Sequence, residues 1–236
     1  MNQLATDGIA PNQGEDESAY FTQVFAWMAV GLAATGAVAA AVYASGTALH
    51  AFEGNSGPTI FIILAILELA LVAGLVGLVQ HMSLFETGAT FLAYCVLNGV
   101  TFSVIFLAYT TTSIVSTFLV TAIMFGAIAL WGYTTKRDLT GWGTFLFMAL
   151  IGQLVGLVVN LFWLNDTLYW VTTAVGVLLF SAYTAYDVQR LKRYEPPPGA
   201  DYAVVEKDAI VGALALYLDF VNLFLYLLRL LGKSKR

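Results

Sequence analysis

The sequence predicts an all-α membrane protein with seven transmembrane helices. Of its 236 residues, 59% are hydrophobic and only 11% are charged, whereas a soluble domain carries about 25% charged residues. The hydrophobic residues occur in runs of about 20–25, enough for a helix to cross about 30 Å of hydrocarbon. Within lipid, a helix satisfies all the backbone hydrogen bonds of such a run. The lipid bilayer is therefore the first expected partner.

The seven predicted spans follow one another along the chain with mostly polar connections. They cover residues 21–45, 59–82, 89–109, 113–135, 142–164, 168–189 and 209–231. Gly, Pro, Asn or charged residues interrupt the pattern between most of them, as is usual in connections. The sequence thus divides into an acidic flexible tail (1–19), a seven-helix transmembrane domain (20–232) and a short basic tail (233–236). The acidic start lacks the basic region of a secretory signal, so the first span is expected to be retained.

The distribution of Lys and Arg predicts the orientation. With seven spans, the fourth–fifth and sixth–seventh connections lie on the same side as the N-terminus, and they carry Lys136, Arg137, Arg190, Lys192, Arg193 and Lys207. The opposite side has Lys233, Lys235 and Arg236. The positive-inside rule therefore places the N-terminus in the cytoplasm. A last segment that enters the membrane and turns back would place all these cations inside, and the sequence leaves that alternative open.

Composition argues against several classes of function. The net charge of -5 is opposite to that of a nucleic-acid-binding protein. The single Cys95 excludes a disulfide framework, and His50 and His81 have no metal-ligand spacing. No nucleotide-binding, zinc or Ser-His-Asp pattern is present. We expect neither an enzyme nor a bound cofactor, and the oligomeric state stays open.

Two aspartates lie inside the last two predicted spans, Asp187 in the sixth and Asp219 in the seventh. A carboxylate inside a bilayer costs about 2.5–3.5 kcal/mol even on the lowest scales, and such residues mark ion or proton routes. If the two helices pack side by side and the seventh starts late, the carboxyls can meet. They could not easily both ionise, so they would share a proton that holds the helices together.

The two aspartates could also bind a cation, and Asp187 has a purely structural explanation as well. Fully ionised, Asp187 and Asp219 would form an oxygen-rich site for a hard cation such as Ca²⁺. For Asp187 alone, a pair with Arg190 at i+3 is an equally good explanation. The buried position of Asp219 favours a functional role.

Other polar residues in the spans have supporting roles in this interpretation. Glu68 and Arg229 lie at comparable depths in the membrane, which predicts an intramembrane ion pair. We expect this ion pair to be mainly structural. The alternative is that the two residues form a second site for a passing cation. Asn222, one turn beyond Asp219, could bond to it or line the same path.

The chain resembles the Bax inhibitor family, also called the transmembrane Bax inhibitor motif family. The resemblance is carried by Tyr183-Thr184-Ala185-Tyr186-Asp187-Val188-Gln189-Arg190, by the stretch around Leu216-Tyr217-Leu218-Asp219-Phe220 up to Gly232, and by Glu68. It implies a central seventh helix wrapped by helices one to three and four to six. It also implies a pH-sensitive calcium leak, gated by Asp187 and Asp219, with Ca²⁺ as the permeant or transiently bound ion and a Glu68–Arg229 contact in support.

One departure from the family concerns the closed state. Some members carry a basic residue late in the second helix that contacts the sixth-helix aspartate. Here no Lys or Arg precedes Lys136, and Gln80 and His81 occupy that region. We expect His81 or Arg190 to replace this contact. The long connection between the sixth and seventh spans is placed to cover the cytoplasmic mouth.

Two alternative functions stay open at this point. A regulatory interaction protein, acting on a membrane protease or in cell-death or stress signalling, would use the acidic tail and the last connection to contact a membrane-protein partner. An intramembrane aspartyl protease would need two carboxylates that share a proton, but those enzymes have Gly-x-Gly-Asp where this chain has Tyr217-Leu218-Asp219. Ala- and Gly-rich spans and the compact length favour a bacterial inner membrane over the endoplasmic reticulum or Golgi.

Overall fold

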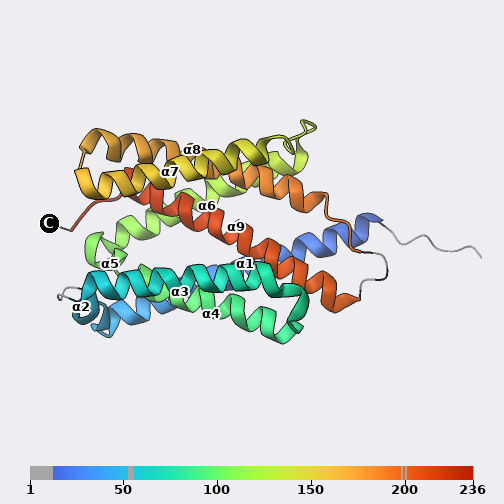
Figure 1. Cartoon of the computed structure of the whole chain (residues 1–236), viewed down its shortest axis with the longest axis horizontal. Coiled ribbons are helices and arrows are strands. Elements are labelled where there is room, and N and C mark those ends of the chain that lie inside the picture. Colours follow the sequence, from blue (N-terminus) through green and yellow to red (C-terminus); the bar gives the residue numbers. More distant parts are fainter. Residues whose placement is uncertain (1–12, 53–55, 198, 200, 236) are drawn as a thin grey trace, which may run out of the picture.

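Seven long helices make up most of the computed structural model, which describes residues 13–52, 56–197, 199 and 201–235. All seven are long and apolar enough to cross a membrane, which confirms the predicted class. The long helices are α1 (Gln13–Ala44), α3 (Gly57–Leu78), α4 (Leu84–Phe102), α6 (Thr111–Thr134), α7 (Trp142–Trp163), α8 (Asp166–Lys192) and α9 (Tyr202–Leu231) (Figure 1). Three short elements lie between them, namely α2 (Thr47–Phe52), the 3-10 turn η1 (Val79–His81) and α5 (Ile105–Ala108).

Several helix ends differ from the predicted ends because capping residues, not hydrophobicity, decide where a helix begins. α4 starts at Leu84, since the Ser83 hydroxyl accepts from the Glu86 amide at 3.2 Å and the Glu86 carboxylate accepts from the Ser83 amide at 2.7 Å. α9 starts seven residues before the predicted 209, capped by the Asp201 carboxylate. α1 already begins at Gln13, so part of the predicted tail is helical. Residues 1–12 of that tail lie outside the described residues.

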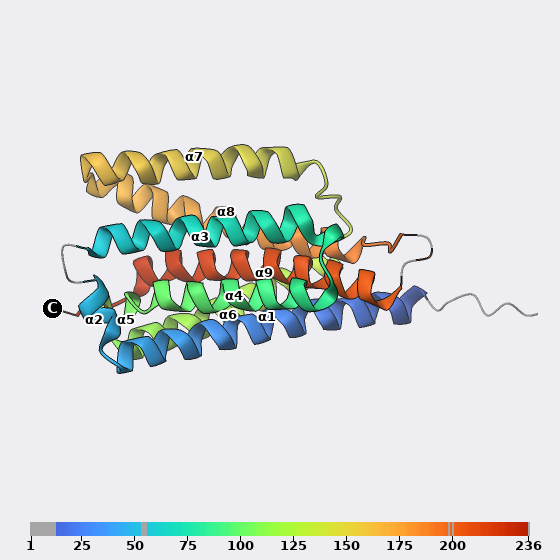
Figure 2. The ribbon, with the colours of Figure 1, turned by 60° about the horizontal axis from the view of Figure 1, so that its bottom comes forward.

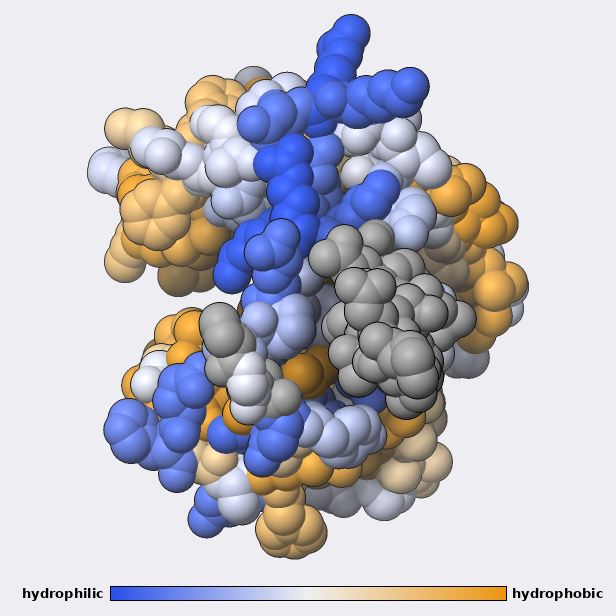
Figure 3. All heavy atoms as spheres, turned by 90° about the vertical axis from the view of Figure 1, so that its right-hand side faces the viewer, coloured by the Kyte–Doolittle hydropathy of each residue, from blue (hydrophilic) through white to orange (hydrophobic). Residues whose placement is uncertain are grey.

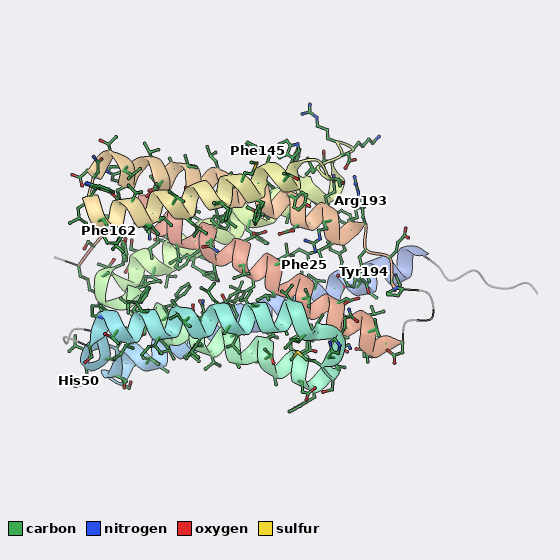
Figure 4. The ribbon with its side chains drawn as sticks, in the orientation of Figure 1. Phe25, His50, Phe145, Phe162, Arg193 and Tyr194 are labelled. Atoms are coloured by element: carbon green, nitrogen blue, oxygen red, sulfur yellow. The ribbon has the colours of Figure 1, made fainter. Side chains whose placement is uncertain are left out.

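α9 is the central helix, as predicted. In its most apolar stretch 72% of residues are buried, compared with 11% in α3 and in α7. Its neighbours are α1, α4, α6 and α8, whereas α3 packs mainly on α4 and α7 on α8 (Figures 1 and 2). The second and fifth spans therefore form an outer layer of the wrapping around α9. They expose apolar side chains outward, including Phe145 and Phe162 of α7, which are 69% and 75% exposed (Figure 4).

Small residues allow the inner helices to approach closely. A Cβ on Gly132 of α6 would lie 2.7 Å from the Ala185 carbonyl oxygen of α8, and one on Gly176 of α8 would lie 2.5 Å from the Tyr226 ring of α9. In lipid, helices associate through such close packing because no hydrophobic force acts between them. Gly132 and Gly176 therefore help to hold α8 against both α6 and α9.

The short basic tail is tied to the rest of the molecule. The Thr110 amide donates to the Lys233 carbonyl at 3.1 Å, and the Lys235 amide donates to the Ala108 carbonyl at 2.9 Å. The Lys235 ammonium donates to the Tyr43 hydroxyl at 2.9 Å. The end of α9 is therefore fastened to the α5–α6 corner and to α1.

Candidate functional site: an aspartate pair on the central helix

Asp187 of α8 and Asp219 of α9 meet inside the helix bundle. Their carboxyl groups lie within hydrogen-bonding reach of each other, and the residues are only 8% and 4% exposed. Asp187 lies about one and a half turns before the end of α8, and Asp219 almost five turns after the start of α9. The carboxyls therefore meet as we expected, but the seventh helix does not start late, so the reason that we gave is wrong. α9 instead starts early and projects past the end of α8.

The pair needs a proton to form a hydrogen bond, because two ionised carboxylates offer only acceptors. One Asp219 oxygen, Oδ2, is buried without a hydrogen-bond partner among the described residues. A proton shared by the carboxyls would join α8 to α9, and two ionised carboxylates here would be like charges in contact.

Two other side chains of α8 act on the pair. The Arg190 guanidinium lies 3.8 Å from Asp187, and its side chain is 70% exposed, so it is a weak ion-pair partner. Tyr183 lies within electrostatic range of both aspartates. Sequence reasoning did not select Tyr183, although its place one turn before Asp187 could have done so.

A cavity of about 390 Å³ leads to Asp187 from the end of the molecule that carries the α8–α9 connection. Its polar lining comes from Tyr20, Asp187, Arg190, Tyr194 and Asp208. Its apolar lining includes residues of α3 and α9. Asp219 is not part of the lining. Of the two carboxyls, Asp187 is therefore the one that the cavity reaches.

Tyr194, directly after α8, covers part of this cavity. Its ring stacks on the Tyr20 ring of α1 at 4.2 Å between centroids and 11° between planes. Its hydroxyl donates to Asp208 Oδ2 of α9 at 2.6 Å. Burial and this hydrogen bond raise the pKa of Tyr194 above its ordinary value, so the phenol stays a neutral donor. Tyr194 is thus the described residue of the α8–α9 connection that lines the cavity, and the idea that this connection covers the mouth stays a prediction.

The end of α8 is also fixed to the α6–α7 connection. The Gln189 side chain accepts from the Leu139 amide at 2.8 Å and donates to the Arg137 carbonyl at 2.7 Å. The Arg193 guanidinium donates to Asp138 at 2.8 Å. Arg193 and Tyr194 lie at the same end of the molecule (Figure 4), and these contacts fasten the end of α8 to the α6–α7 connection.

The predicted Glu68–Arg229 ion pair does not form among the described residues. The Glu68 carboxylate instead accepts from the Thr101 hydroxyl at 2.6 Å and from the Asn98 amide at 3.4 Å. Both partners belong to α4, on which the outer helix α3 packs. Arg229 lies over the Tyr226 ring, 5.5 Å from its centroid. The prediction failed because equal depth does not make two helices neighbours.

Other predicted supporting residues also have different partners. The Asn222 amide donates to the Leu218 carbonyl of its own helix at 2.8 Å and not to Asp219. His81 is exposed at the end of η1. Its neighbourhood is contacted by Lys207 of α9, whose ammonium donates to the Val79 and Met82 carbonyls at 3.4 and 3.2 Å. Sequence reasoning missed Lys207, since backbone carbonyl partners leave no mark in a sequence.

The described residues contain no cluster of three or more His, Cys, Asp or Glu side chains that could hold a metal ion. His50, on α2, lies at the opposite end of the molecule from Arg193 and Tyr194 (Figure 4). The aspartate pair offers at most four oxygens, whereas Ca²⁺ takes about 6–8. A calcium ion at the pair would therefore keep part of its water shell.

Comparison with known proteins agrees with this arrangement. A family model described as "Inhibitor of apoptosis-promoting Bax1" matches residues 17–236. The chain belongs to the Bax inhibitor-1-like family. It is 47% identical to the inner membrane protein YbhL of Escherichia coli K12, over 92% of both chains. It is 37% identical to an uncharacterized protein of Borreliella burgdorferi, again over 92% of both.

A further relative, an uncharacterized protein of Deinococcus radiodurans, is 36% identical over 92% of this chain and 90% of its own. The predicted family is thus confirmed over nearly the whole chain. This Bax inhibitor-1-like protein is an integral, multi-pass membrane protein.

Proposed function

We propose that this Bax inhibitor-1-like protein is a pH-sensitive calcium leak channel of a bacterial inner membrane, gated by the proton shared between Asp187 and Asp219. The observation that carries the proposal is the contact between the two buried carboxyls, one on the central helix and one beside it. Acidic residues inside a membrane bundle are typical of ion and proton pathways. The name of the E. coli relative, an inner membrane protein, supports the choice of membrane.

In the proposed gate, the shared proton holds α8 against α9 at low pH. As pH rises and the proton leaves, the two carboxylates repel each other and the helices separate at this level. The ionised pair then offers oxygen ligands to a passing, partly hydrated Ca²⁺. The cavity brings the ion to Asp187 from the side that we propose to be cytoplasmic.

The groups that face the pair tune this response. Arg190 and Tyr183 of α8 act on it directly. Tyr20 of α1, Tyr194 of the connection and Asp208 of α9 line the same cavity. Arg190 favours the ionised pair, so the pH of opening depends on it. His81, which is exposed and has no described contact with Asp187, does not serve as the closing residue in this proposal.

We also propose that the pair is not a catalytic dyad. Asp219 does not line the cavity, so a substrate in that cavity could reach only one of the two carboxyls. Proteolysis by two aspartates requires both to reach the scissile bond or its water.

The proposal is tested by Ca²⁺ flux into dye-loaded liposomes that contain the purified protein, across a pH series. Flux should rise with pH in the unaltered protein. Asp219→Asn and Asp187→Asn should flatten this dependence, because an amide donates to the remaining carboxylate at every pH. Asp166→Asn, an exposed aspartate at the other end of α8, is the matched control and should leave it unchanged.

Flux equal to that of empty liposomes at every pH would overturn the channel proposal. The regulatory interaction protein would then be the better explanation, with the aspartate pair as a structural or sensing element. Unchanged pH dependence in both Asn variants would leave a channel but reject this gate.

A further inference from the structure

The cavity beside Asp187 combines an apolar wall with charges of both signs. Its volume of about 390 Å³ lies within the range of about 300–1,000 Å³ that is common for ligand pockets. The ion pathway uses only the carboxyl at its inner end. The rest of the lining has the composition of a site for an amphiphile, with an apolar side and a charged side.

The apolar wall is formed by the outer helix α3 and the central helix α9. It includes Val72 and Val76 of α3 and Val211, Ala215 and Leu218 of α9. Val76 is 54% exposed, on a helix whose outward residues, such as Leu69, are up to 70% exposed. The end of the molecule that carries the α8–α9 connection has a notch on one side, with apolar residues along its edges (Figure 3). An acyl chain can therefore lie along this wall.

The charged side lies near the ends of the helices. Arg190 is in the last turn of α8, and Asp208 is in the second turn of α9. The Arg190 guanidinium is 3.8 Å from Asp187, too far for a hydrogen bond, and its side chain is 70% exposed. Its N–H groups are therefore available to a ligand. Arginine binds phosphate well because its planar fork donates two parallel hydrogen bonds.

Asp208 provides the opposite charge at the same end of the cavity. Its Oδ2 accepts from Tyr194, and its Oδ1 has no donor among the described residues. Asp208 and Arg190 line the same cavity, together with Tyr20. The stacked rings of Tyr20 and Tyr194 add aromatic surface, which attracts a cation through its π electrons.

We propose that this cavity binds phosphatidylethanolamine. The lipid phosphate would accept from Arg190, the primary ammonium would donate to Asp208, and one acyl chain would follow Val72, Val76 and Leu218. Phosphatidylglycerol has no ammonium and would bring a net negative charge towards Asp187 and Asp208. Phosphatidylcholine has a quaternary ammonium that cannot donate to Asp208. This inference concerns binding alone, so it stands or falls independently of calcium flux.

The test is native mass spectrometry of the delipidated full-length protein, titrated with the three phospholipids carrying identical acyl chains. Phosphatidylethanolamine should bind about tenfold more tightly than the other two, the effect of one charge-assisted hydrogen bond of about 1.5 kcal/mol. Equal affinity for phosphatidylglycerol would overturn the proposal. This comparison uses the unaltered protein, so it does not depend on how well any variant folds.

Variants assign the two headgroup contacts. Arg190→Gln and Asp208→Asn should each reduce phosphatidylethanolamine affinity to about that of phosphatidylcholine. In Asp208→Asn the new amide oxygen can still accept from Tyr194, so the stacked tyrosines keep their place. Arg193→Gln is the matched control, since Arg193 lies at the same end but contacts Asp138 and does not line the cavity. Unchanged affinity in Asp208→Asn would reject the ammonium contact and with it the proposal.

A photoactivatable acyl chain gives an independent location. Phosphatidylethanolamine with a diazirine on its chain should label peptides that contain residues 72–76 and 211–218, and excess unlabelled phosphatidylethanolamine should suppress this labelling. Labelling confined to the outer face of α7, or labelling that competitor lipid does not suppress, would mean ordinary contact with the bilayer and would overturn the proposal.

Discussion

The aspartate pair and Glu68 are both carboxyl sites inside membrane-spanning helices, but they are surrounded by opposite kinds of hydrogen-bonding group. The carboxyls of Asp187 and Asp219 face each other, so that the oxygens on both sides are hydrogen-bond acceptors. Glu68 meets two donors, the Thr101 hydroxyl and the Asn98 amide. The pair cannot bond without a proton, whereas Glu68 can keep both of its hydrogen bonds as an anion.

Position in the fold amplifies this difference. The pair lies where α8 packs on the central helix α9, so a change in its charge acts on the centre of the bundle. Glu68 lies between the outer helix α3 and α4, next to a network in which the Asn98 oxygen accepts from the Tyr217 hydroxyl at 3.3 Å. We infer that the first site suits a switch and the second suits a structural support.

The largest expected effect follows from removing one carboxyl of the pair. In the unaltered protein, thermal stability in detergent should fall as pH rises, because loss of the shared proton leaves two like charges in contact. A buried charge without compensation costs about 3–5 kcal/mol. Asp219→Asn should abolish most of this pH dependence, and Glu68→Gln should preserve it. Circular dichroism melts across a pH series measure both; equal slopes in the two variants would remove the distinction between the sites.

Removing the donors from Glu68 should make that site resemble the aspartate pair. Thr101→Val and Asn98→Leu together leave the carboxylate without donors, and hydrogen bonds to charged groups contribute about 1.5–3 kcal/mol. We expect a loss of stability near neutral pH that is partly recovered on acidification, when Glu68 can be protonated. Thr134→Val, which removes an exposed hydroxyl bonded within its own helix, is the control. A loss that does not change with pH would indicate packing damage instead.

Much of this fold could be predicted from the sequence, because apolar runs in lipid must become helices and their length sets their number. The helix ends could be predicted less well. The start of α4 depends on Ser83 and Glu86 and the start of α9 on Asp201, all polar residues outside the hydrophobic window. The contact between Asp187 and Asp219 could also be predicted, because a carboxyl inside a bilayer needs a polar partner just as the backbone there needs its hydrogen bonds.

The partners of Glu68 and Lys207 could not be predicted for a geometric reason. Depth along a helix can be read from a sequence, but the direction in which a residue points around the bundle cannot. Glu68 and Arg229 have comparable depths, yet α3 packs on α4, and α4 supplies Thr101 and Asn98. Lys207 binds backbone carbonyls, which every residue possesses.

Lys207 offers a way to test whether the two carboxyl sites communicate. It joins α9, the helix of Asp219, to the end of the span that carries Glu68. A cation at a helix C-terminus contributes about 0.3–1 kcal/mol, so Lys207→Met should reduce stability by about that amount. Lys207→Arg retains the charge and should restore most of it. If Lys207→Met also shifts the pH dependence of calcium flux, α3 moves with the gate; if only stability changes, the two sites are independent.

The smallest expected effect comes from a third carboxyl, Asp138, which lies outside the membrane spans and is exposed. Its hydrogen bonds with the Thr140 amide and hydroxyl and with Arg193 lower its pKa to about 2. Because the folded-state pKa lies below the unfolded value, the stabilisation is fully present above about pH 4 and is lost only as pH falls through about 2.

Asp138 therefore stays ionised throughout the range in which the aspartate pair is proposed to switch. Asp138→Asn should leave the shape of the pH–flux curve unchanged between about pH 5 and about pH 8. A curve shifted by Asp138→Asn would mean that the α6–α7 connection, through Arg193 and the end of α8, takes part in gating. An unchanged curve in this variant, together with a flat curve in Asp219→Asn, would assign the pH response to carboxyls that face one another inside the bundle.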